Sequence, residues 1–95
     1  MTNPYVITLP RLGGVRESAT TLAESLPRDL AGSQVVVDAE TNLTCSQGFV
    51  DELLKQILEI RNTEQVIIVN WNEHLKVYAN LSGVKRGYLN QITFR

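Results

Sequence analysis

The residues best suited to chemistry in this chain are its lone cysteine, its lone histidine and a few neighbouring polar side chains. Glu40, Cys45, Ser46 and His74 each follow a predicted strand, and Asp38 lies at the end of one. A cysteine with a histidine base and an orienting carboxylate is a set used in nucleophilic catalysis. The sequence nevertheless has no nucleophile elbow and no loop typical of an oxyanion hole. We therefore expect no catalytic residues, no cofactor and no enzymatic activity, with Cys45 as a small buried hydrophobe.

The residue pattern does not indicate a metal site or a phosphate-binding loop. One cysteine and one histidine are too few for a structural zinc site, and the carboxylates lack the spacing of metal ligands. Gly13 and Gly14 lack the lysine ending and the third glycine of phosphate-binding loops, so we interpret them as a turn. We expect no metal site.

Ser46 has two compatible roles. It precedes a strongly helical segment, where a serine hydroxyl caps the free backbone N–H groups. Thr44 is an alternative cap, with Gln47 three residues later completing a capping box. A phosphate on Ser46 would be tolerated by the helix dipole and would repel a close-fitting acidic partner. Capping and phosphorylation both stay open at this point.

Short runs of β-branched residues alternate with longer helical patterns, and these elements must position the polar residues. Such an alternation pairs its strands in parallel through right-handed crossovers. We therefore expect one α/β domain over residues 1–95, in β-α-β-α-β-α-β order, with a small mixed or parallel sheet of about four strands and helices packed on it. The order of the strands stays open. The predicted strands are residues 5–9, 34–39, 65–70 and 88–94, and the predicted helices are residues 15–26, 46–61 and 72–82.

The longest predicted helix, residues 46–61, divides into two faces. We place Asp51 and Glu52 on its solvent side, where Asp51 stands four residues before Lys55 in the favoured order of an ion pair. Its apolar stripe consists of Phe49, Leu53, Ile57 and Ile60.

The last predicted helix has a clear start and end. Asn72 is the expected N-cap, and Gly83 is the expected terminator. Trp71 precedes this helix and is either an interface anchor or a ring folded back over the core. Lys85 and Arg86 are interpreted as a solvated turn.

Charge and composition exclude several classes of partner. The 95 residues include 9 basic and 10 acidic side chains, and the formal net charge is −1. Nucleic acids and anionic membranes both favour a basic excess, so we expect neither as a partner. The apolar runs are short, the start lacks the features of a signal peptide, and one cysteine cannot form an internal disulfide. The expected location is the cytoplasm.

Two segments resemble the signature of the STAS superfamily, which is named after sulfate transporters and anti-sigma-factor antagonists. Val35-Val36-Val37-Asp38 followed by Cys45-Ser46-Gln47-Gly48-Phe49 is similar to a strand ending in aspartate and a serine-bearing helix start. Val69-Asn70-Trp71-Asn72-Glu73, continuing to Leu81-Ser82-Gly83-Val84, is similar to the later strand–Asn–helix–Ser-Gly block. The opening Ser-x-x-Phe-x-Asp-Glu-Leu looks like a bacterial STAS-like branch of poorly assigned function.

The resemblance implies a non-catalytic regulatory module that binds another protein by partner switching. In the antagonist family the matching serine is phosphorylated by an ATP-using serine kinase of the anti-sigma type, and the phosphate breaks the complex. Ser46 is the matching position and the phosphorylation candidate, although Cys45 replaces an acidic residue found in many antagonists. The alternatives are a small-ligand or nucleotide sensor and a self-associating accessory subunit. The predicted interaction residues are Asp38, Glu40, Asn42, Thr44, Cys45, Ser46, Gln47, Phe49, Glu52 and Trp71.

Overall fold

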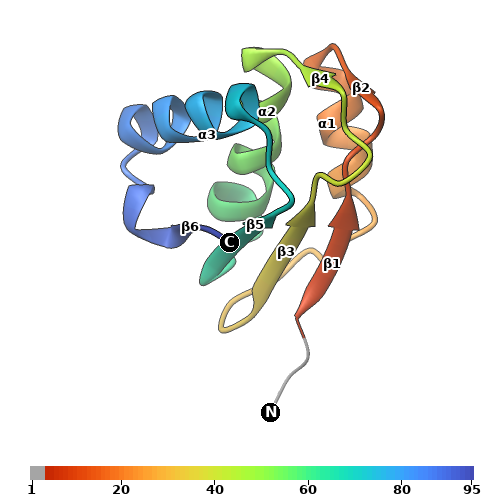
Figure 1. The fold of residues 1–95 in the computed structure, drawn as a ribbon. Helices are drawn as coiled ribbons and strands as arrows, with labels where there is room; N and C mark the ends of the chain where they lie inside the picture. The colour runs from red at the N-terminus through yellow and green to blue at the C-terminus, as the bar shows by residue number, and fades with distance from the viewer. Residues whose placement is uncertain (1–3) are drawn as a thin grey trace.

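Runs rich in β-branched residues form the strands of the central sheet. The computed structural model, which describes residues 4–95, pairs these strands in the order β1-β3-β5-β6, with every pairing parallel (Figure 1). The expected α/β class is confirmed, and the strand order that the sequence left open simply follows the chain. The strands are β1 (Tyr5–Thr8), β3 (Gln34–Asp38), β5 (Gln65–Val69) and β6 (Ile92–Phe94).

The helices cover one face of this sheet (Figure 1). Right-handed crossovers between strands that succeed one another across a sheet place every connecting helix on the same side. The opposite face has no helix on it within residues 4–95, and there the side chain of Val6 is largely exposed. The helices are α1 (Arg16–Ala23), α2 (Gln47–Leu54), the π-helix η1 (Lys55–Ile60) that continues α2, α3 (Glu73–Arg86) and the short 3-10 turn η2 (Leu89–Gln91).

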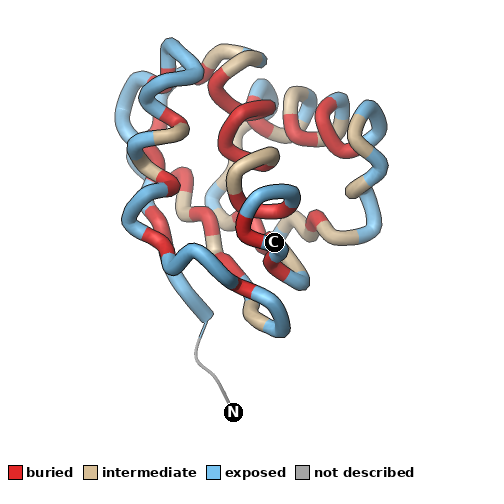
Figure 2. Tube along the Cα trace, turned by 180° about the vertical axis from the view of Figure 1, so that it is seen from behind, coloured by how far each residue is buried: buried red, intermediate tan, exposed pale blue. Residues whose placement is uncertain are grey.

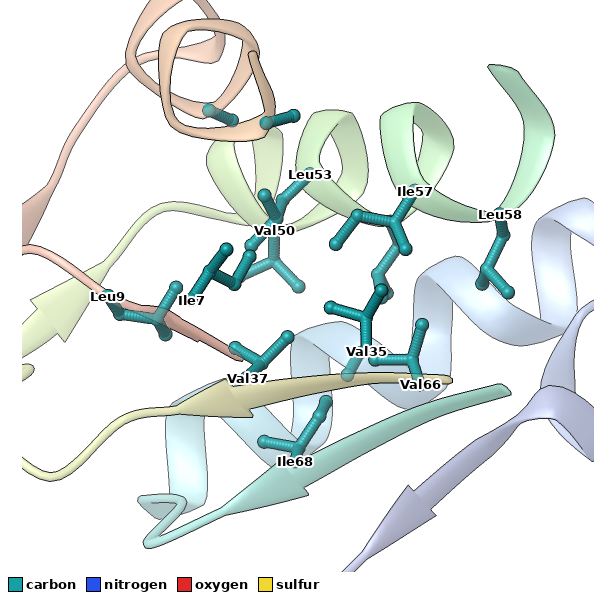
Figure 3. Close-up of a cluster of buried hydrophobic side chains, with 14 of the residues drawn as sticks. Ile7, Leu9, Val35, Val37, Val50, Leu53, Ile57, Leu58, Val66 and Ile68 are labelled. Carbon is teal, nitrogen blue, oxygen red and sulfur yellow. The ribbon is translucent and has the colours of Figure 1, made fainter. Parts of the chain in front are cut away.

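The hydrophobic core lies between the covered face of the sheet and α2. Alternate residues of the strands point at the helix, because neighbouring side chains of a strand face opposite ways. Figure 2 shows the buried residues gathered in the middle of the molecule, while the outer turns and loops are exposed. Figure 3 shows this cluster, in which Ile7, Leu9, Val35, Val37, Val66 and Ile68 meet Val50, Leu53, Ile57 and Leu58.

A second, two-stranded sheet includes Gly13, which we expected in a turn, and residues 44–45, which lie between the predicted strand 34–39 and the predicted helix 46–61. β2 (Leu12–Gly13) pairs in parallel with β4 (Thr44–Cys45). Gly13 fits here because a Cβ atom would lie 2.9 Å from a ring carbon of Phe49. The small sheet therefore ties the segment after β1 to the start of α2.

The ends of several elements differ from the sequence prediction. α1 ends at Ala23 instead of residue 26, and η2 occupies Leu89–Gln91, in the first half of the last predicted strand. α3 continues through Gly83 to Arg86, and Gly87 ends it with a left-handed φ of 79°. Gly83 is buried, and a Cβ atom there would lie 3.1 Å from the Ile92 side chain, so its small size serves packing instead of termination. The predicted helix of residues 46–61 changes to π-helical geometry after α2, and this wider turn leaves Ile60 exposed instead of in the apolar stripe.

Candidate functional site

The carboxyl ends of β3 and β5 bring polar side chains together. Asp38 Oδ1 accepts hydrogen bonds from Asn70 Nδ2 at 3.0 Å and from the backbone N–H of Glu40 at 2.9 Å. These bonds, that from Asn70 first, hold the pKa of the Asp38 carboxyl below its usual value. Asn70 has a left-handed φ of 55°, which asparagine tolerates better than most residues. The two loops are thereby held against each other at this edge of the sheet.

Asn42 and Asn72 organise the loop that leads to α2. Asn42 is buried, and its Nδ2 donates to the carbonyl oxygens of Pro10 at 2.7 Å and Thr44 at 3.1 Å. Asn72 Oδ1 accepts from the backbone N–H of Leu75 at 2.9 Å, so the predicted N-cap of α3 is confirmed. Both asparagines use their side chains to fix backbone.

Ser46 is the N-cap of α2. Its Oγ accepts from the backbone N–H of Phe49 at 3.0 Å, and its own N–H donates to the carbonyl oxygen of Gly13 at 2.7 Å. Thr44 lies in β4 with an exposed side chain, so the alternative cap was wrong. Capping by Ser46 is confirmed, while its phosphorylation stays a prediction.

Cys45 lies in the protein interior. Burial raises the pKa of its thiol, which lowers the fraction of reactive thiolate at neutral pH. His74 is exposed in the first turn of α3. The prediction that Cys45 is a buried hydrophobe is confirmed.

The predicted interaction residues divide by accessibility. Four of them are buried and cannot meet a partner in this structure, because backbone and neighbouring side chains cover them: Asn42, Cys45, Phe49 and Glu52. Those that reach the surface are Asp38, Ser46 and Trp71, which are half-buried, and Glu40, Thr44 and Gln47, which are exposed.

Trp71 is folded back over the edge of the sheet. Its ring meets Phe94 edge to face, with 6.0 Å between the ring centroids. The ammonium group of Lys76 lies 4.5 Å from the centroid of the indole, a cation–π contact. The residue is half-buried, so the packing role and a contact role are compatible.

The solvent-facing position predicted for Asp51 was wrong, and the same holds for Glu52. Asp51 is only 5% exposed and joins three helices. Arg86 donates to it through Nε and Nη2 at 2.7 Å each, Arg16 Nη1 donates at 3.0 Å, and Ser82 Oγ donates at 2.7 Å. Arg86 most of all holds the pKa of the Asp51 carboxyl well below its usual range.

These partners correct two further expectations. Asp51 pairs with Arg16 and Arg86, and no ion pair to Lys55 is among the contacts of residues 4–95. Arg86 is half-buried in this cluster, so it is not part of a solvated turn. The polar side of α2 is buried because α1 and α3 pack against it.

A groove beside the start of α2 was missed in the sequence. Val77, Leu81 and Val84 of α3 are 50%, 49% and 67% exposed, and they recur at the spacing of one helix face. We call them the α3 stripe. The three residues stand four and three positions apart in the sequence, and they stay exposed because α3 buries a different face, which includes Leu75 and Ala79. The groove has a volume of about 580 Å³ and is lined by Gln47, Val77, Asn80, Leu81, Val84 and Lys85.

No protein-family model, no curated protein and no solved structure matches this chain. Within residues 4–95, no group of three or more His, Cys, Asp or Glu side chains is placed to hold a metal ion. In the same part of the chain, no helix combines the length and the apolar character needed to cross a bilayer.

Proposed function

We propose that this chain is a non-catalytic regulatory module that binds another protein at the start of α2 and along the α3 stripe, with Ser46 as the point of control. One observation carries the proposal. Ser46 caps α2, and the next residue, Gln47, forms a wall of the groove beside the α3 stripe. A charge added at Ser46 would therefore stand at the edge of a surface suited to docking.

The chemistry of the groove favours a protein partner with apolar side chains and a carboxylate. Single exposed apolar residues are ordinary, but three on one helix face that line a groove form a surface that a partner can cover. Lys85 is the one charged side chain among the groove's lining residues. A carboxylate of the partner would be attracted to it.

Phosphorylation would act on the same charges. The capped helix start tolerates a phosphate, since the backbone N–H of Phe49 already donates to Ser46 Oγ. The added charge of about −1.5 to −2 would repel the partner's carboxylate and compete for Lys85. The resemblance to STAS antagonists supports an ATP-using serine kinase of the anti-sigma type as the partner, and the cytoplasm as the place of the complex.

Three bait proteins test the switch: the parent chain, Ser46→Asp and Ser46→Asn. Asparagine and aspartate both cap helices well, so the two variants differ in charge and not in capping. We expect affinity capture from native lysate, quantified by mass spectrometry, to retain the same partner on the parent and Ser46→Asn and to lose it on Ser46→Asp. Equal retention on all three baits would refute control at Ser46.

A second pair of variants tests the surface. Leu81→Glu places a charge in the α3 stripe, whereas Val6→Glu places one on the open sheet face, where the side chain is also exposed. We expect Leu81→Glu to lose the partner and Val6→Glu to keep it. Loss on both, or on neither, would contradict docking at the α3 stripe.

A further inference from the structure

Arg61 is a buried cation whose charge has no carboxylate partner among residues 4–95. The residue is 8% exposed, and the ion pairs of the described chain involve Arg16 and Arg86 only. Its Nη1 donates to the neutral Gln56 Oε1 at 2.9 Å, and its enclosed Nε has no hydrogen-bond acceptor in the described protein. A buried guanidinium without a counter-charge is unfavourable, so its retention calls for an explanation.

The π-helical turn brings Arg61 to this position. Residues five apart in an α-helix point about 140° away from each other. In η1 the wider turn lets the backbone N–H of Arg61 donate to the Gln56 carbonyl oxygen at 3.1 Å, and the arginine side chain returns over the Gln56 amide. That amide donates to Glu52 at 2.9 Å, and Glu52 already lies 3.5 Å from Arg16. Arg61 therefore contacts the neutral amide oxygen of Gln56, while the nearest carboxylate in this series of contacts, Glu52, is bonded to the other end of that amide and lies near Arg16.

Arg61 also lines a pocket between the end of α1 and η1. The pocket has a volume of about 390 Å³, a size at which small ligands bind. Arg28, exposed and without an ion pair within residues 4–95, lines it as a second cation. Glu24 is the only carboxylate among its lining residues, so the charges sum to +2 − 1 = +1 at neutral pH. The pocket is lined by Thr20, Glu24, Arg28, Gln56, Ile60 and Arg61.

We infer that this pocket binds a tetrahedral oxyanion of the phosphate type. Guanidinium groups recognise such anions through paired, charge-assisted hydrogen bonds. The anion supplies Arg61 and Arg28 with the counter-charge that the described chain does not, while Thr20 and Gln56 add polar side chains at its edge. The site shares no lining residue with the groove beside Ser46, so it stands apart from the proposed partner switch.

Inorganic phosphate is the probe, at constant ionic strength balanced with chloride. We expect a saturable rise of the unfolding temperature, because a ligand that binds only the folded state stabilises it. In a nitrogen–proton NMR spectrum, the Nε–H resonance of Arg61 should shift with the same saturation curve. Acetate at equal ionic strength should give neither effect.

Three exposed positions give matched variants with opposite expectations. Arg28→Gln removes a cation of the pocket and should weaken phosphate binding roughly tenfold or more, the usual worth of one charge-assisted hydrogen bond. Glu24→Gln removes the opposing carboxylate and should tighten binding. Arg11→Gln changes an exposed arginine that does not line the pocket, and it should bind phosphate as the parent does.

Several outcomes would overturn the inference. These are a rise of the unfolding temperature that does not saturate, an equal response to acetate, and an equal loss of binding in Arg28→Gln and Arg11→Gln. A failure here leaves the partner switch untouched, because the baits altered at Ser46 keep this pocket unchanged.

Discussion

The two ends of the helix formed by α2 and η1 differ in how completely their polar groups are paired. At the start, Ser46 satisfies a free backbone N–H, and Asp51 holds two arginines and a serine. At the end, Arg61 meets one neutral amide oxygen and keeps an Nε–H without an acceptor in the described protein. Paired buried groups fix a structure, whereas an unpaired one costs stability. The paired groups at the start of the helix therefore fix its position. The unpaired Arg61 at its end is a cation that can bind the proposed anion.

The largest expected effect comes from Asp51→Asn. The change removes the carboxylate and leaves Arg16 and Arg86 without their shared counter-charge. Breaking a buried ion pair from one side costs roughly 3 kcal/mol or more, so the free energy of unfolding should fall by about that amount. Urea unfolding followed by circular dichroism measures it.

Glu59→Gln is the matched control for this prediction. Glu59 also lies near Arg86, at 3.3 Å, but its side chain is exposed, and such pairs contribute less than about 1 kcal/mol. If the two variants lose the same stability, the Asp51 ion pairs do not hold the three helices together.

Acid should break the ion pairs of Asp51 with Arg16 and Arg86, because it protonates the Asp51 carboxylate. The pKa of Asp51 is lower in the folded chain than in the unfolded chain, so its contribution is present above the unfolded value near pH 4 and is lost as the pH falls below it. The free energy of unfolding of the parent should decline steeply below about pH 4. In Asp51→Asn the decline should be shallower. Parallel curves for the two proteins would assign the acid sensitivity to other carboxyls.

Gly13→Ala should disturb the start of α2 through packing. Its new methyl group would lie 2.9 Å from the Phe49 ring, which is fully buried and cannot move freely. Overpacking of this kind costs about 1–3 kcal/mol. Gly14→Ala is the control, because a Cβ atom there meets nothing within 4 Å. Equal stabilities of the two variants would show that the close contact between Gly13 and the Phe49 ring does not constrain the start of α2.

The features predicted correctly from sequence are those with local causes. The β-branched runs around Val36 and Ile67 and the helical spacings between them give the α/β order and parallel pairing. Ser46 and Asn72 cap helices because their side chains reach a backbone N–H three residues along the same segment. The lone Cys45 is buried in the hydrophobic core, as expected for a small apolar side chain.

The features missed depend on contacts between distant segments. Asp51 looks solvent-facing on its own helix, and only the packing of α1 and α3 brings Arg16 and Arg86 to it. The small sheet of β2 and β4 joins residues that carry no strand pattern of their own, since each strand has two residues. The π-helical turn at Arg61 likewise has no mark in the spacing of its residues.

The smallest expected effects compare the two ends of the helix directly. Ser46→Ala removes a cap and should lower the free energy of unfolding by about 1 kcal/mol. Arg61→Met removes a buried charge together with one hydrogen bond to Gln56, and an apolar side chain of similar length can fill its place. Since an unpaired buried charge is itself unfavourable, this variant should lose less than Ser46→Ala, or gain stability.

The comparison is made by urea unfolding of both variants in chloride buffer free of phosphate. Ser46→Asn, which keeps the cap, should match the parent within a few tenths of a kcal/mol. A larger loss of unfolding free energy in Arg61→Met than in Ser46→Ala would mean that Arg61 stabilises η1, as Asp51 stabilises α2. A smaller loss in Arg61→Met than in Ser46→Ala would mean that the unpaired guanidinium destabilises the folded protein when no anion is bound. A bound anion would then remove that destabilisation.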